Sequence, residues 1–128
     1  MASKADIATI LETFLWSNND NSTDTGGEPL DENYSARDVD DDTVAKLSAL
    51  VDALYQTAEV LGVTVDDKAV HRSYLDATGH GTGLWDDYLE SWAGQGKAWS
   101  DALRATDAGK ALRDSCAYVG DDGKIHVG

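Results

Sequence analysis

The first hydrophobic pattern along the chain has the period of a helix. Apolar side chains recur three and four positions apart at Ile7, Ile10, Leu11, Phe14 and Leu15. This spacing places them on one face of an α-helix, and Ser3 is suited to cap its first turn. The pattern predicts an amphipathic helix that ends near Trp16.

The longest apolar stripe comes later and has the same period. It consists of Val44, Leu47, Val51, Leu54, Ala58 and Leu61. Gly62 follows this stripe directly and is a natural C-terminal stop for a helix. A third helix is predicted between Asp66, which is a suitable N-cap, and Gly79, which is a second stop.

Aromatic side chains dominate the next stretch. One face of a predicted short helix carries Trp85, Tyr88, Leu89 and Trp92. Trp99 and Leu103 predict another helix, and Thr106 is suited to cap a last helical turn that reaches Leu112. Because the stripe from 44 to 61 needs cover, we expect three tryptophans to be buried against it: Trp85, Trp92 and Trp99.

The end of the chain changes to strand signals. Residues 117–119 and 125–127 flank a Gly-Asp-Asp-Gly turn, which predicts a β-hairpin over 117–127. These elements together predict one α+β domain over residues 1–128 that is mainly α, with about five helices.

Cys116 is the only cysteine, so an internal disulfide is excluded. We expect this small residue to be buried.

Residues 17–42 show neither period. This stretch is polar and acidic and holds the only proline, Pro29, so it is predicted to be a long loop. Loops of this length in compact domains are uncommon unless they have a function. We expect it to bind a basic partner through Asp20, Asp24, Glu28, Asp31, Glu32, Asp38, Asp40, Asp41 and Asp42. The alternatives are a solvated loop that serves only solubility and, for 38–42, acidic groups that complement a helix dipole.

The charge of the chain narrows the choice of partners. Its 24 acidic and 10 basic side chains give a formal net charge of −14, which repels nucleic-acid phosphates and anionic membranes. We therefore expect neither direct nucleic-acid binding nor membrane binding. An acidic face can instead dock on a basic protein groove that normally holds DNA. The chain shows no secretion signal and no apolar run of about 18 residues, which predicts a cytoplasmic protein.

Two histidines flank the end of the third predicted helix. His71, His80 and Asp86 can together offer two imidazoles and a carboxylate to a divalent cation. Their spacing matches no defined zinc motif. The alternative is structural, with His80 held in a turn by its flanking glycines and His71 on a helix surface.

The turn after this helix is rich in glycine. Gly79, Gly81 and Gly83 precede Trp85, and a glycine turn before a helix can cradle a phosphate or another small ligand. The dinucleotide pattern is incomplete, so a tight turn is the alternative.

A window that starts at Asp20 resembles a calcium loop, but it lacks the central glycine and the final glutamate. Apart from such a divalent cation no cofactor is expected, no catalytic residue is assigned, and a binding role is favoured over an enzymatic one.

Three motifs span nearly the whole chain. They are Leu-Trp-Ser-Asn-Asn-Asp at 15–20 with Gly-Gly-Glu-Pro-Leu-Asp-Glu-Asn-Tyr at 26–34, Gly-His-Gly-Thr-Gly-Leu-Trp-Asp at 79–86, and Tyr-Val-Gly-Asp-Asp-Gly-Lys-Ile at 118–125. With these motifs the chain resembles a family of small uncharacterised proteins encoded by bacteriophages and prophages. Similar members often carry His-Asp-Phe-Trp-Leu-Thr-Arg-Asn before the glycine motif, and of that run only His71 and Leu75 are present here. The resemblance implies a phage accessory context and assigns no catalytic residue.

The leading hypothesis is therefore a phage-type acidic accessory protein. It would bind and inhibit a host or anti-phage defence protein through a basic, nucleic-acid-binding surface of that protein. One rival is a metal-assisted hydrolase or a small-ligand or nucleotide-binding protein centred on His71, His80 and Asp86. Another is a structural or assembly subunit whose aromatic helices oligomerise.

Overall fold

A mainly helical fold with a small C-terminal hairpin confirms the predicted fold class. The computed structural model describes residues 2–20, 28–79, 83–84, 95–113 and 115–128. Within these residues the α-helices are α1 (Lys4–Ser17), α2 (Asp41–Leu61), α3 (Asp67–Thr78), α4 (Gly96–Ala105) and α5 (Asp107–Arg113). The helix expected over 85–92 lies outside the described residues.

The helix ends follow the predicted capping signals. The Ser3 hydroxyl accepts a hydrogen bond from the Asp6 N–H at 3.1 Å and so caps α1. Asp66 caps α3 by accepting from the Ala69 N–H at 2.8 Å. Gly62 and Gly79 end α2 and α3 with φ angles of 71° and 74°, a left-handed conformation that glycine adopts without a Cβ clash.

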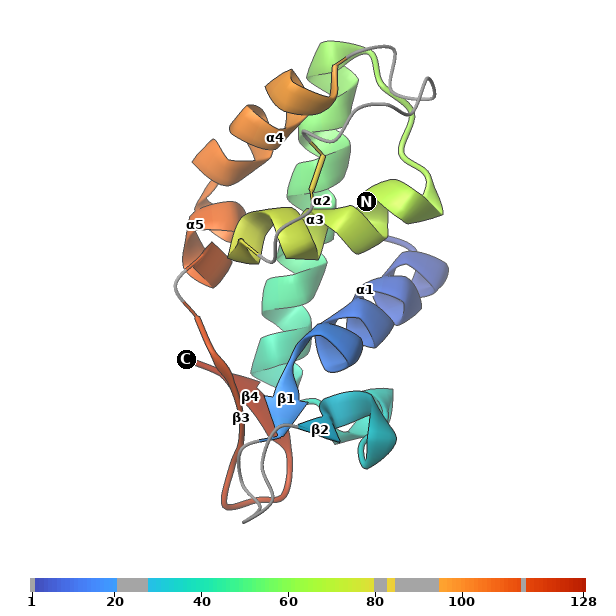
Figure 1. Cartoon of the computed structure of the whole chain (residues 1–128). Coiled ribbons are helices and arrows are strands. Elements are labelled where there is room, and N and C mark those ends of the chain that lie inside the picture. Colours follow the sequence, from blue (N-terminus) through green and yellow to red (C-terminus); the bar gives the residue numbers. More distant parts are fainter. Residues whose placement is uncertain (1, 21–27, 80–82, 85–94, 114) are drawn as a thin grey trace.

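The core forms around α2, and the other four α-helices of the described residues pack against it (Figure 1). Its predicted stripe faces inward, with Leu47, Val51 and Leu54 fully buried. Trp99 on α4 is also fully buried, and its indole N–H lies 3.0 Å from the Thr57 hydroxyl of α2. The prediction for Trp99 is confirmed, whereas Trp85 and Trp92 lie outside the described residues.

The described parts of the segment predicted as a long acidic loop, residues 17–20 and 28–42, contain more secondary structure than the sequence indicated. Strands β1 (Asn19–Asp20) and β2 (Glu28–Pro29) pair antiparallel, and two 3-10 turns follow, η1 (Leu30–Glu32) and η2 (Ala36–Asp38). Leu30 and Val39 are 1% and 3% exposed. Two isolated apolar side chains show no period, so sequence patterns miss them, but their burial anchors the segment to the core.

The predicted hairpin forms from β3 (Ala117–Val119) and β4 (Ile125–Val127). Its turn uses Gly123, whose φ is 77°, as the Asp-Asp-Gly sequence predicted. Ile125 also pairs with Val39, and its carbonyl accepts the Asp40 N–H at 2.9 Å. The hairpin therefore lies against the start of α2 (Figure 1).

The prediction for Cys116 is wrong, because this residue is exposed. Its backbone pairs with that of Gly128 at the open end of the hairpin. Side chains two positions apart on a strand point to the same face. Cys116 therefore faces outward with Tyr118, which is 51% exposed.

Candidate functional site

The candidate site is a groove beside Trp16. It lies between α1, α3 and the segment that contains η1 and η2, and its volume is about 540 Å³. We call it the Trp16 groove and define it by Glu12, Thr13, Trp16, Asp31, Tyr34 and His71. Small-ligand and side-chain pockets commonly have volumes of several hundred cubic ångströms. The groove is thus large enough to hold a ligand or a side chain of a partner.

Trp16 is the most unusual member of the groove. It sits in the last turn of α1 and is 57% exposed, although a tryptophan side chain gains more from burial than most others. Its ring centroid lies 5.7 Å from that of His71, with the ring planes tilted by 45°. The indole is therefore held against α3 and still presents much of its surface to the groove.

His71 is fixed in place by a hydrogen bond to α1. Its Nδ1 lies 2.7 Å from the Thr13 hydroxyl, which also lies 3.1 Å from the Thr9 carbonyl. Burial, and then the positive charge of Arg72, lower the pKa of His71. His71 is consequently neutral at pH 7 and adds no positive charge to the groove.

The titration of His71 should make the fold sensitive to mild acid. The unfolded histidine takes up a proton near pH 6.5, and the folded one does so only at a lower pH. Between these two pH values the unfolded state binds more protons than the folded state, so we expect the free energy of unfolding to fall as the pH drops from 7 to 5.

His71→Asn should reduce this fall, since an amide keeps a hydrogen-bonding group near Thr13 but does not titrate. Urea unfolding at several pH values measures the effect for both proteins. An NMR titration of the imidazole signals serves as the control. An equally steep fall in the variant would contradict the assignment to His71.

The acidic residues predicted to bind a partner differ in their exposure and in their contacts. Asp31, Glu32, Asp41 and Asp42 are exposed. Asp38 and Asp40 instead have local structural contacts, because the Asp38 carboxylate accepts from the Ser35 N–H at 2.8 Å and Asp40 accepts from the Asp42 N–H at 3.0 Å. Asp20 and Glu28 pair through their backbones, and Asp24 lies outside the described residues. The exposed group is therefore the better candidate for contact with a partner.

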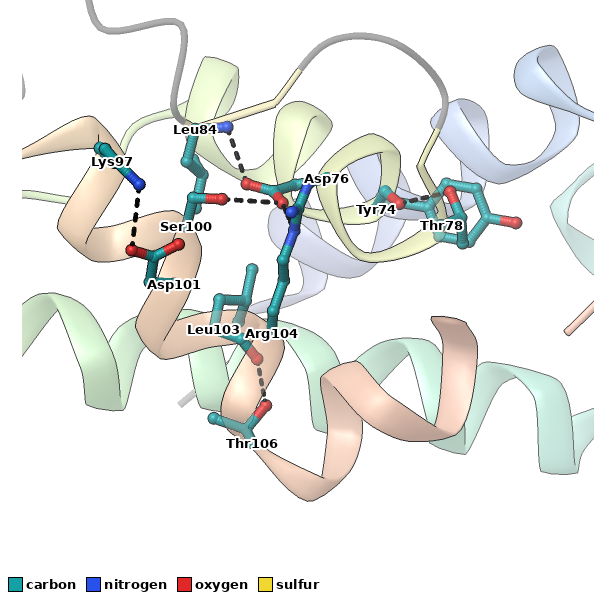
Figure 2. A network of polar contacts seen from close by, with 10 residues as sticks. All are labelled: Tyr74, Asp76, Thr78, Leu84, Lys97, Ser100, Asp101, Leu103, Arg104 and Thr106. Carbon is teal, nitrogen blue, oxygen red and sulfur yellow. Dashed lines mark hydrogen bonds and ion pairs between the residues drawn. The ribbon is translucent and has the colours of Figure 1, made fainter. Parts of the chain in front are cut away.

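A buried carboxylate that sequence reasoning missed lies between α3 and α4. Asp76 is 1% exposed. Its oxygens accept hydrogen bonds from the Leu84 N–H at 2.9 Å, the Ser100 hydroxyl at 3.0 Å and the Arg104 Nε at 2.6 Å, as Figure 2 shows. The signal in the sequence was its position, seven residues after the apolar Ala69 and hence on the same buried face of α3.

The Asp76 network includes a residue of the glycine-rich turn, Leu84. The predicted ligand residues of this turn are Gly79, Gly81, Gly83 and Trp85. Gly79 ends α3, and the Gly83 carbonyl accepts from Arg72 at 3.3 Å. The N–H of Leu84, the next residue, points at the Asp76 carboxylate. The described part of this turn thus makes protein contacts, as a tight structural turn would. Gly81 and Trp85 lie outside the described residues.

The predicted metal residues are only partly described. His80 and Asp86 lie outside the described residues, and His71 contacts Thr13. Another group with metal-ligand chemistry, which sequence reasoning missed, is formed by Asp40, Asp122 and His126, whose ligand atoms lie within 4.8 Å of one another.

In this group the two carboxylates contact different nitrogens of one imidazole. His126 Nε2 lies 3.0 Å from Asp122 and Nδ1 lies 3.6 Å from Asp40. The His126 hydrogen bond, with one from the Lys124 N–H, lowers the pKa of Asp122. The group as it stands links the hairpin to the start of α2.

Comparisons with models of protein families, with curated proteins and with solved structures found no match to this chain. Among the described residues, none of the helices has both the length and the apolar character needed to cross a membrane.

Proposed function

We propose that this chain is a phage-type accessory protein whose acidic surface binds and inhibits a host or anti-phage defence protein. The target surface is basic and normally binds nucleic acid. The net charge of −14 supports this proposal, because it favours association with basic surfaces. The resemblance of the three sequence motifs to phage-encoded proteins supports the biological setting.

The observation that carries the proposal is the ordered backbone of residues 28–42, the part of the acidic segment that leads into α2. Buried Leu30 and Val39 anchor it, and the Asp38 carboxylate closes the turn of η2. Exposed carboxylates on η1 and in the first turn of α2 are therefore presented by a fixed backbone. A surface that is already ordered loses less conformational entropy when a partner binds.

Neutralising three exposed carboxylates should slow association with the partner. The variant combines Glu32→Gln, Asp41→Asn and Asp42→Asn, and it spares Asp38 and Asp40, which hold local structure. We expect the association rate at low salt to fall about tenfold with little change in the dissociation rate, because long-range attraction acts mainly on association.

The experiment captures the partner from host lysate with the wild-type protein and then measures binding kinetics at several salt concentrations. Competition with duplex DNA for the captured partner tests the inhibitory role. The matched control neutralises three exposed acids elsewhere, Glu59→Gln, Asp67→Asn and Asp101→Asn. Equal rates and equal salt dependence in the two variants, or a partner that binds DNA unimpeded, would refute the proposal.

A further inference from the structure

We infer that the Trp16 groove seats one arginine side chain of the basic partner. This inference rests on the proposed function and adds the chemistry that the groove recognises. It is carried by two features of the groove, namely aromatic faces held in position and carboxylates at its edge.

The aromatic faces are held in position before any partner arrives. Trp16 packs beside His71, and the hydrogen bond from His71 to Thr13 fixes the imidazole between α3 and α1. Tyr34 lines the same groove and is half-buried. A guanidinium group stacks well on the face of a tryptophan or tyrosine ring, and it loses little hydration energy when it does so.

The charge of the groove is negative. Glu12 and Asp31 line it and are exposed, and within the described residues neither carboxylate makes an ion pair or a hydrogen bond. Arg37 on η2 is exposed and does not line the groove. The groove therefore attracts a cation and repels a phosphate.

Arginine fits these two features better than lysine does. Its planar head can stack on Trp16 while its N–H groups donate to a carboxylate such as that of Asp31. An ammonium group is a compact, strongly hydrated charge that gains less from an aromatic face. The groove volume of about 540 Å³ also accommodates a long side chain together with its planar head.

Hexa-arginine and hexa-lysine peptides test this inference, because they have equal length and charge. Titration calorimetry at low salt measures both affinities. We expect the wild-type protein to bind hexa-arginine about fivefold more tightly than hexa-lysine, a difference in the range of single cation–π contacts. Trp16→Ala should abolish this preference and leave the affinity for hexa-lysine within about twofold. Asp31→Asn should reduce the preference as well.

Tyr118→Ala is the matched control, since Tyr118 is also an exposed aromatic residue but lies on the hairpin. It should keep the preference for arginine. Circular dichroism melting curves confirm that each variant is folded. Equal affinity of the wild-type protein for the two peptides, or a preference that survives Trp16→Ala, would overturn the inference.

The outcomes also separate the inference from the proposed function. Salt-dependent binding of both peptides with equal affinity, weakened by neutralising Glu32, Asp41 and Asp42, would leave the proposed function standing and the inference refuted. Binding of neither peptide at low salt would count against both.

Discussion

Trp99→Ala is expected to lower the free energy of unfolding by about 4 kcal/mol, which is typical of removing a large aromatic side chain from a core. The side chain is fully buried between α4 and α2. Its removal leaves a cavity and takes away the indole N–H that lies near the Thr57 hydroxyl and the Leu54 carbonyl, at 3.0 Å and 3.3 Å. Urea unfolding followed by circular dichroism measures the loss.

Two variants sharpen this test. Trp99→Phe keeps most of the ring volume and loses the indole N–H, so it should cost less than Trp99→Ala. Trp16→Ala removes the same type of side chain from an exposed position, and we expect a change of less than about 1 kcal/mol. If Trp99→Ala and Trp16→Ala had equal effects, Trp99 would not be a core residue.

Asp76→Ala is expected to lower the free energy of unfolding by about 3 kcal/mol, since it removes a buried carboxylate that three donors share. The Leu84 N–H and the Ser100 hydroxyl would lose a buried acceptor, and the Arg104 guanidinium would lose its ion pair (Figure 2). The Arg104 side chain is 43% exposed, so water can solvate it in the variant. This exposure keeps the expected loss below that of a fully buried pair.

Asp101→Ala is the matched control for this prediction. Asp101 lies one residue after Ser100 on α4 and pairs with Lys97 at 3.5 Å, and both side chains are mostly exposed. Removing an exposed ion pair changes stability by less than about 1 kcal/mol. Equal urea midpoints for wild-type protein and Asp76→Ala would show that the network contributes no net stability.

The helices could be predicted from sequence because their signals are local. Apolar side chains at helical spacing, caps such as Asp66 and stops such as Gly62 all lie within a few residues of the elements that they define. The hairpin was predictable for the same reason, since its turn sequence lies between its two strands. Exposure of Cys116 follows from strand alternation, once the strand is extended by one residue to include it.

The Trp16 groove could not be predicted, because its walls come from segments far apart in the sequence. Thr13 and His71 are 58 residues apart, yet their side chains are in hydrogen-bonding contact. The sequence marked Asp31 as acidic and Trp16 as the end of a helix, but it did not show that both line one groove. The same holds for Asp40, which meets Asp122 and His126 only through the packing of the hairpin.

The pairing of Val39 with Ile125 makes the acidic surface depend on the last strand to be synthesised among those described. A nascent chain that has not yet reached Ile125 lacks the acceptor for the Asp40 N–H and one of the side chains that pack near Val39. The segment between η1 and α2 then keeps its contacts with α1 but lacks the pairing with β4. Ribosome-bound or truncated chains would therefore lack part of the packing that holds this segment. Under the proposed function, we expect them to bind the partner only once the C-terminal strand is in place.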